Sequence, residues 1–199
     1  MKLRREIWEK SKVGELAIIK GGKRLPKGKT LVNYITEFPY IRVTDFENNS
    51  VNKNSILYLL EEDYIKIKNY SISNNDVFIS IAGTIGLIGI IPEELDGANL
   101  TENAAKLVIK NNKILYQQYL LFALLSSNLQ NQIKRGTATT AQPKLGLNKI
   151  SNLEILLPPL EEQKQIAELF QSIENAIEQV DGQERNLKSL QKNLVDGLM

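Results

Sequence analysis

Residues 160–199 read LEEQKQIAELFQSIENAIEQVDGQERNLKSLQKNLVDGLM, and they decide the architecture of this chain. Apolar side chains recur in this stretch at alternating steps of four and three residues, the a/d spacing of a coiled-coil seam. Pro158 and Pro159 precede it, and Glu161 and Glu162 suit the positive end of a first helical turn. The pattern predicts a helix of roughly 38 residues, about 57 Å long, which exceeds one face of a small domain and needs a partner helix.

The predicted seam has two alternative partners. A second copy of the chain could pack against it in antiparallel fashion, giving a two-fold dimer with one body at each end of the helical pair. Alternatively the helix folds back on its own domain, and Phe170 suits either arrangement. Continuing the spacing places Glu184 and Gln191 at core positions, where polar groups cost stability but fix register. Gly182 weakens the helix by about 1 kcal/mol relative to alanine. The expected dimerisation residues are Ile166, Phe170, Ile173, Ile177, Val180, Leu187, Leu194 and Leu198.

The composition of the 199 residues limits the available chemistry. Hydrophobic residues make up 42% of the chain, enough for a packed core. There is no cysteine for disulfide or thiolate chemistry, and no histidine, the commonest general base and transition-metal ligand. No apolar run approaches the roughly 20 residues that span a bilayer, and the start, MKLRREIWEK, lacks the apolar segment of a secretory signal. We therefore expect a soluble, cytoplasmic protein.

The charge is distributed unevenly along the chain. Residues 1–158 contain 21 Lys and Arg against 15 Asp and Glu, a net charge of +6. Residues 159–199 contain 4 against 8, a net charge of −4. A mildly basic body is compatible with binding to a phosphate backbone, although many domains of this charge bind no nucleic acid.

Short apolar runs alternate with polar loops before the long helix, which is typical of a mixed α and β domain. The run over 13–19 fits a short strand or helix, and a single long helix is expected over 115–133. The fold class is therefore predicted as α+β, with a strand-rich domain over residues 1–157 followed by one long coiled-coil helix over 158–199. Further strands are expected over 40–46, 55–60, 77–82, 87–91, 104–109 and 150–157.

Residues 20–30, KGGKRLPKGKT, form the first of two predicted basic loops. The loop resembles a phosphate-binding P-loop, but five residues separate Gly22 from Gly28 where four are required, and Pro26 removes a backbone N–H donor. The following residues, 31–39, also make a poor helix. The remaining alternatives are a solvated loop and a loop that grips nucleic-acid phosphates, and we prefer the second. Its candidate DNA-binding residues are Lys23, Arg24, Lys27 and Lys29.

The predicted strand over 40–46 carries a second group of polar side chains. Arg42 and Thr44 are two residues apart, so they would face the same side of a strand. One interpretation is a half-exposed strand with a surface ion pair. In the other, Arg42 reaches a DNA base edge or phosphate and Asp45 orients it.

Gly83, Thr84 and Gly86 interrupt an apolar stretch. Glycine at such a place permits positive φ and close approach of the backbone to another group. A tight turn between two buried strands and a direct ligand contact, with Thr84 as the contacting side chain, both fit this pattern.

Residues 134–144, KRGTATTAQPK, form the second basic loop. Hydroxyls, amides and cations are the groups that contact phosphates and base edges, and the loop has no acid. A loop rich in Thr and Gly is also an ordinary connector. The candidate DNA-binding residues here are Lys134, Arg135, Thr137, Thr139, Thr140 and Lys144.

Catalytic and metal-binding patterns are missing from the sequence. There is no Gly-x-Ser-x-Gly elbow, no zinc-ligand spacing and no Gly-x-Gly loop that opens a helix. Asp76 and Glu102 are carboxylates that no pattern selects for a metal. We expect no catalytic residue, no metal and no cofactor.

Several blocks of the sequence together resemble the DNA-sequence specificity subunit of type I restriction–modification systems. They are YIRVTDF from Tyr40, NNDVFISIAGTIGLIG from Asn74, NLTENAAKL from Asn99, AQPKL from Ala141 and LEILLPPLEEQKQIAELF from Leu153. The resemblance covers nearly the whole chain, and the combination is specific where no single block would be. It implies a target-recognition domain that binds double-stranded DNA without catalysis of its own.

The resemblance also implies partners. A usual specificity subunit holds two recognition domains and two long helices, and directs DNA adenine methyltransferase subunits and a restriction/translocase subunit to a split DNA site. This sequence has one recognition domain and one helix, so it resembles a half-length form that would act as a homodimer. Two other classes stay open: a nucleotide-dependent or nuclease enzyme using residues 22–30, and a coiled-coil module that binds protein.

Overall fold

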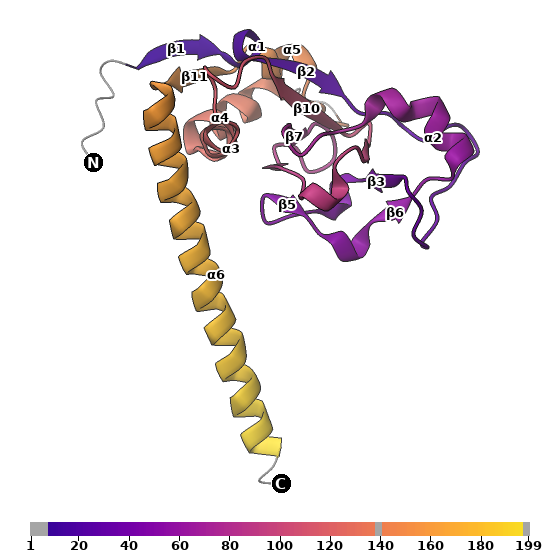
Figure 1. Cartoon of the computed structure of the whole chain (residues 1–199), viewed down its shortest axis with the longest axis vertical. Coiled ribbons are helices and arrows are strands. Elements are labelled where there is room, and N and C mark those ends of the chain that lie inside the picture. The colour runs from indigo at the N-terminus through magenta and orange to yellow at the C-terminus, as the bar shows by residue number, and fades with distance from the viewer. Residues whose placement is uncertain (1–7, 138–140, 197–199) are drawn as a thin grey trace.

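The computed structural model describes residues 8–137 and 141–196 and shows a body of short strands and helices from which one long helix, α6, extends (Figure 1). Helix α6 runs over Leu160–Asp196, 37 residues. The predicted helix and the predicted α+β class are therefore confirmed. One expected dimerisation residue, Leu198, lies outside the described residues.

Two sheets organise the body. The larger sheet has the strand order β2-β10-β7-β8 with antiparallel pairing throughout, and the smaller has the order β6-β3-β9 with β3 and β9 parallel. A short hairpin, β4-β5, and the pair β1-β11 complete the strands of the described part. The strands are β1 Glu9–Lys12, β2 Ala17–Gly21, β3 Pro39–Ile41, β4 Phe46–Glu47, β5 Ser50–Val51, β6 Leu57–Tyr58, β7 Val77–Ser80, β8 Ile88–Gly89, β9 Asn99–Leu100, β10 Ala104–Ile109 and β11 Glu154–Leu157.

Short helices cover the larger sheet and connect its strands. Helix α3 packs against β7 and β8, α4 packs against α3 and α5, and α5 packs on β2. Before α6 the α-helices are α1 Val13–Leu16, α2 Glu61–Ile67, α3 Gln117–Leu125, α4 Ser127–Gly136 and α5 Leu147–Ser151. Single 3-10 turns lie at η2 Val43–Asp45, η3 Lys53–Ser55, η4 Lys68–Tyr70 and η5 Glu93–Leu95.

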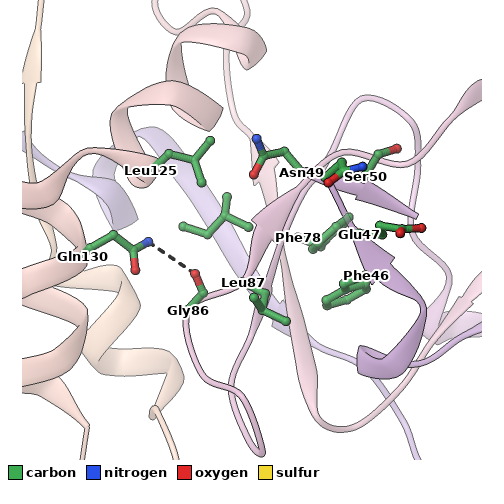
Figure 2. A pocket seen from close by; sticks show the side chains of 11 residues that line it. Phe46, Glu47, Asn49, Ser50, Phe78, Gly86, Leu87, Leu125 and Gln130 are labelled. Atoms are coloured by element: carbon green, nitrogen blue, oxygen red, sulfur yellow. Dashed lines mark hydrogen bonds between the residues drawn. The ribbon is translucent and has the colours of Figure 1, made fainter. Parts of the chain in front are cut away.

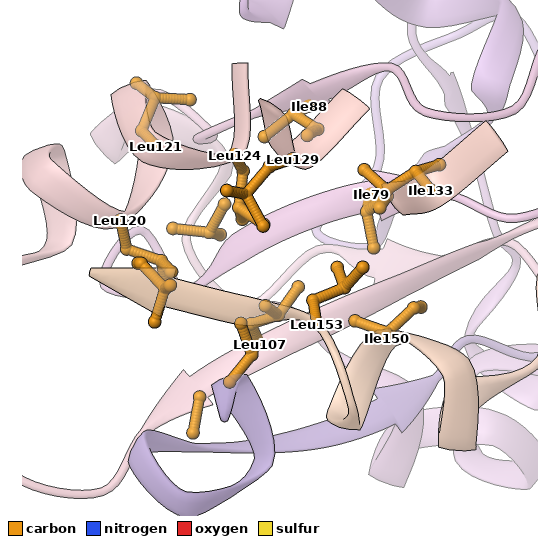
Figure 3. Packing of buried hydrophobic residues seen from close by; sticks show 14 of the residues in the cluster. Ile79, Ile88, Leu107, Leu120, Leu121, Leu124, Leu129, Ile133, Ile150 and Leu153 are labelled. Carbon is orange, nitrogen blue, oxygen red and sulfur yellow. The ribbon is translucent and has the colours of Figure 1, made fainter. Parts of the chain in front are cut away.

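Strand β7 divides the hydrophobic core. All four of its residues are buried, and alternate side chains of a strand point to opposite faces. Val77 and Ile79 enter the main cluster with α3, α4 and α5, whose packing Figure 3 shows. Phe78 enters a second cluster on the other face, where its ring stacks on Phe46 at 3.9 Å. The strand predicted over 77–82 is therefore found as β7, which ends at Ser80 and is one of the two inner strands of the larger sheet.

Several sequence predictions placed element boundaries wrongly, and the strands predicted over 55–60 and 87–91 are shorter, at Leu57–Tyr58 and Ile88–Gly89. The strand predicted over 40–46 ends at Ile41, because the Asp45 carboxylate accepts the backbone N–H of Arg42 and closes the η2 turn. The helix predicted over 115–133 is two helices, because Ser126 has an extended backbone and its hydroxyl accepts the N–H of Leu129 as an N-cap.

The C-terminal boundaries of the body also differ from the sequence prediction. Helix α4 continues to Gly136, so Lys134 and Arg135 lie in its last turn and not in a loop. The strand predicted over 150–157 begins at Glu154, after α5. Helix α2 was not predicted at all.

The first turns of α6 are fastened to the body by a buried amide. Gln163 is fully buried, and its Nε2 donates to the carbonyls of Ile114 and Pro158, both at 2.8 Å. Its Oε1 accepts the backbone N–H of Tyr116 at 2.9 Å. The indole N–H of Trp8 donates to Glu162 at 2.9 Å on the same turn.

Two residues expected in the dimer seam contact their own domain, one of them, Phe170, while its side chain stays 45% exposed. Ile166 is 8% exposed and belongs to the main core cluster. Phe170 stacks on Phe122 of α3, with ring centroids 5.2 Å apart. The alternative in which the helix folds back on its own domain therefore holds for these turns of α6. Further along the helix, the apolar side chains are 46–69% exposed at Ile173, Ile177, Val180, Leu187 and Leu194.

A backbone strap holds the first basic loop at the edge of the larger sheet. Gly22 N–H donates to the Ala104 carbonyl at 2.9 Å, and Lys23 N–H donates to the Leu100 carbonyl at 2.8 Å. The strap passes so close to the turn between β9 and β10 that a Cβ on Gly22 would lie 2.1 Å from the Thr101 carbonyl oxygen. Glycine is required here for space, and the neighbouring Gly21 has ordinary clearance of 3.8 Å.

Replacing Gln163 tests the attachment of α6. Gln163→Leu should lower the free energy of unfolding by about 2–4 kcal/mol, because one N–H and two carbonyls lose their partner in poorly hydrated surroundings. Urea unfolding followed by circular dichroism measures the change. Gln171→Leu, at an exposed position of the same helix, should stay within about 0.5 kcal/mol of the unaltered chain. Equal losses for both variants would contradict the anchoring role of Gln163.

The adjacent glycines provide a matched test of the strap. Gly22→Ala should destabilise the body by about 2 kcal/mol or more, because its Cβ meets backbone that cannot move without breaking the strap. Gly21→Ala should change stability by less than about 0.5 kcal/mol. Thermal unfolding of the two variants measures the difference. An unchanged stability of Gly22→Ala would show that the close contact between the strap and the turn is not required for the fold.

Candidate nucleic-acid interface

Four segments far apart in the sequence meet at one edge of the body. The strap at Gly22 contacts the turn between β9 and β10. The same turn also accepts a hydrogen bond from the end of β7, where Ile81 N–H donates to the Asn103 carbonyl at 2.7 Å. Ala82 forms a β-bridge with Lys144, and Leu145 N–H donates to Ile81. A shallow cavity of ≈ 370 Å³ lies between them, lined by Gly21, Gly22, Lys23, Arg24, Ile81, Glu102, Lys144, Leu145, Gly146 and Leu147.

The structure thus brings the two basic loops together, as neither loop alone predicts. Lys23 and Lys144 are exposed and line the same cavity. The Lys23 ammonium lies 5.4 Å from the ring centre of Tyr70, and Lys27 is exposed further along the loop. Within residues 8–137 and 141–196, Lys23, Lys27 and Lys144 form no ion pair, so their charge is available to an anion.

Two other cations of the first loop are already paired. Lys29 forms ion pairs with Glu62 and, at 3.7 Å, with Asp63 of α2. The hydrogen bond to Glu62 raises the pKa of Lys29, with Coulombic help from Asp63. Lys29 therefore ties its loop to α2 and does not line the cavity.

Arg24 is paired at the cavity itself. Its Nε donates to Glu102 Oε1 at 2.6 Å, although the Arg24 side chain is 78% exposed. Burial would raise the pKa of Glu102, but hydrogen bonds from Arg24, the backbone and Thr101 outweigh it and lower that pKa overall. Both members of the pair are therefore charged at neutral pH, and together they add no net charge to the basic edge.

Arg42 is an internal strut. Its guanidinium donates twice to the fully buried Asp45, at 2.6 and 3.0 Å, and once to the carbonyl of Ser55 at 2.7 Å. Asp45 does orient Arg42, as expected, but η2 replaces the predicted strand and Thr44 does not share a strand face with it. This arrangement favours the structural interpretation of the pair.

The glycine turn is built as the sequence predicts. Gly83 and Gly86 have φ of 74° and 88°, values that other residues rarely adopt. The Ser80 hydroxyl donates to the carbonyl of Thr84 at 2.5 Å, which closes the turn. The Thr84 side chain is exposed, two residues after Ala82, which forms the bridge with Lys144.

The second basic segment is partly helical. Lys134 and Arg135 lie at the C-terminal end of α4, where cations interact favourably with the helix dipole. The Thr137 hydroxyl donates to the Ile133 carbonyl at 2.9 Å, so it caps the helix. Thr139 and Thr140 lie outside the described residues.

Sequence reasoning assigned no place at this edge to Lys149 or Glu102. Lys149 is exposed on α5, and its Cβ would lie 3.4 Å from a Cβ on Gly136, which places it beside the end of α4. Lys149 lies five residues after Lys144, outside the predicted basic loop, so the sequence pattern did not include it. Glu102 lies in a block that carries the family resemblance, but its contact with Arg24 joins residues 78 positions apart and has no local signature.

A second hollow lies between the β4-β5 hairpin and the glycine turn (Figure 2). It measures ≈ 250 Å³ and is lined mainly by Phe46, Phe78, Leu87 and Leu125. Asn49, at the hairpin tip with φ of 56°, donates to Glu174 of α6 at 3.2 Å. The hairpin therefore contacts the long helix as well as the hollow.

The described part of the chain does not support three other features: a metal site, a P-loop and a membrane-spanning helix. No group of three or more acidic residues there is arranged to hold a metal ion. The loop at 22–30 is followed by bends and a single bridge over 31–38, and not by the helix that a P-loop requires. Among the described helices, none is both long and apolar enough to cross a membrane.

Comparison with known proteins points in one direction. The chain matches a family model described as "Type I restriction modification DNA specificity domain" over residues 5–188. It is 25% identical over 159 residues to the type I restriction enzyme EcoBI specificity subunit of Escherichia coli, covering 80% of this chain and 33% of the relative. It is 25% identical over 199 residues to the MjaVIII specificity subunit of Methanocaldococcus jannaschii, covering 98% of this chain and 46% of the relative.

Solved structures share the fold. The S subunit from M. genitalium aligns over 89% of this chain and 42% of its own length, with a TM-score of 0.61 and 19% identity. The HsdS subunit from Thermoanaerobacter tengcongensis aligns over 87% of this chain and 39% of its own length, with a TM-score of 0.62 and 20% identity. The chain spans between a third and a half of the length of these relatives. Since the family model covers most of its residues, the chain belongs to the family of type I restriction–modification DNA specificity domains.

Proposed function

We propose that this chain recognises a specific sequence in double-stranded DNA for a type I restriction–modification complex. The observation that carries the proposal is the meeting of the two basic loops at one cavity, with Lys23 and Lys144 exposed and free of ion pairs in the described structure. Ammonium groups on rigid, solvent-facing loops fix a protein on the phosphate backbone. Lys134, Arg135 and Lys149 extend the basic surface along α4 and α5.

The chain supplies recognition and its partners supply catalysis. Residues 1–157 form the recognition domain and residues 158–199 the spacer helix, whose first turns pack on that domain. The complex adds DNA adenine methyltransferase subunits and a restriction/translocase subunit, and acts in the cytoplasm. Specificity subunits are the relatives that support this assignment.

The exposed stripe of α6 supports a homodimer. Beyond the anchored turns, apolar side chains continue at Ile173, Ile177 and Val180, all about half exposed. A monomer rarely leaves so long an apolar face in water, and a second copy offers the same face in return. In the antiparallel arrangement each end of the helical pair carries one recognition domain, so the dimer reads two related half-sites of a split DNA site.

Salt dependence of DNA binding tests the recognition surface. Lys23→Ala with Lys144→Ala should weaken binding and reduce the slope of log K against log salt by about 1.8, since each phosphate contact contributes about 0.9. Lys134→Ala with Arg135→Ala should act in the same direction. Lys188→Ala with Lys192→Ala, on the far part of α6, removes the same charge as a control and should leave the slope unchanged. An unchanged slope in the first two variants would remove those residues from the interface.

Light scattering tests the dimer. Ile173→Asp with Ile177→Asp places four carboxylates in the paired seam and should give a folded monomer with weakened binding to a DNA that carries two half-sites. Gln171→Asp with Asn175→Asp adds the same charge on the polar face of the helix and should leave the dimer intact. An unaltered chain that is already monomeric at micromolar concentration would contradict the homodimer.

A further inference from the structure

Arg24 differs from every neighbouring cation at the cavity because it has a fixed direction. Its Nε is held by Glu102 at 2.6 Å, and Glu102 is itself held, since the Thr101 hydroxyl donates to its other carboxylate oxygen at 3.0 Å. The remaining N–H groups of Arg24, on Nη1 and Nη2, donate to no residue in the described structure. The side chain is 78% exposed, so these groups face solvent at the rim of the cavity.

The backbone beneath the pair is equally fixed. The strap ties residues 22 and 23 to the turn that carries Glu102, with two hydrogen bonds of 2.8 and 2.9 Å. The Tyr40 hydroxyl donates to the Lys23 carbonyl at 2.8 Å, one residue before Arg24. Both partners of the ion pair therefore stand on segments that are bonded to each other.

A phosphate anchor would not be built in this way. A carboxylate at 2.6 Å cancels the charge that a phosphate contact needs, and it would repel the phosphate itself. The unpaired Lys23, Lys27 and Lys144 are better suited to that task. What the pairing gives to Arg24 is orientation, and orientation is what hydrogen bonding to a base edge requires.

We infer that Arg24 reads a guanine in the major groove and that Glu102 is the residue that positions it. With Nε engaged, the guanidinium presents Nη1 and Nη2 end-on, and these donate to the O6 and N7 acceptors of guanine. Thr101 and Glu102 form the support behind it. This assignment rests on the proposed DNA recognition and adds which residue discriminates between bases and which residues only hold phosphates.

A selection from randomised duplexes, combined with salt titration, tests the assignment on the full chain. Arg24→Lys keeps the charge but loses the two-pronged donor. It should lower discrimination for one guanine in each half-site by roughly ten- to a hundredfold, with the salt slope unchanged. Lys27→Ala, in the same loop, is the matched control. It should reduce the slope by about 0.9 and leave base preference as it is.

Variants of Glu102 separate positioning from charge. Glu102→Ala should lose the guanine preference while general affinity and salt slope rise, because Arg24 is then free to contact phosphate. Glu102→Gln keeps an acceptor for Nε and should restore part of the preference. Thermal unfolding of each variant shows that the fold is intact, as expected for a pair at the surface.

Two outcomes overturn the assignment and are distinct from each other. If Arg24→Lys keeps the preference, or Arg24→Ala weakens binding to all sequences equally and lowers the slope by about 0.9, Arg24 is a phosphate contact and the proposed DNA recognition stands without it. If the unaltered chain retains no DNA at low salt, the proposed function fails and the assignment fails with it.

Discussion

The buried amide of Gln163 fixes where the long helix leaves the body. The helix has 37 residues, and its buried contacts with the body lie in its first turns. Three hydrogen bonds from one side chain to residues 114, 116 and 158 set the direction and rotation of α6 at once. With the helix placed in this way, Ile166 packs into the main core cluster and Phe170 stacks on Phe122. The same rotation determines which face of the helix remains in water further along.

Ion pairing, more than the number of cations, determines what the basic edge can do. Lys29 and Arg42 belong to basic or polar patterns in the sequence, yet both form ion pairs with carboxylates of their own chain. Lys23 and Lys144 keep theirs and meet at one cavity. A net charge of +6 on the body would be poor support for DNA binding without this sorting. The positions of the carboxylates therefore matter as much as those of the lysines.

Long periodic and long apolar segments could be predicted from the sequence. The long helix was expected over 158–199 and is found over Leu160–Asp196, because an apolar repeat at steps of four and three residues fits a helix and no strand. Strands β7 and β10 were found from their apolar runs. The family blocks from Tyr40 to the long helix led to the family that the comparisons then showed.

Single side-chain contacts could not be predicted. The hydroxyl of Ser126 divides a helical pattern that its apolar residues would have continued, and Asp45 ends a strand by accepting one N–H from Arg42. Both side chains hydrogen-bond to nearby backbone N–H groups and so replace the regular helix or strand hydrogen bonds there. The meeting of Gly22 with the β9-β10 turn depends on the folded sheet order, which no window of sequence contains. The cavity that gathers the basic loops was therefore beyond sequence reasoning, although Lys23, Arg24 and Lys144 of its lining were among the predicted residues.

The two halves of α6 differ in burial, and this difference has a physical consequence. The anchored turns contribute to the core of the domain, so their loss would unfold or detach the helix. The outer turns expose their apolar stripe and contribute little to the domain, so the body can stay folded when the stripe is altered. The acidic charge of residues 159–199, −4, also repels a phosphate backbone, whereas the body at +6 attracts it. In the proposed dimer, pairing would use the helix and DNA contact would use the loops, so the two proposed interactions occupy different surfaces.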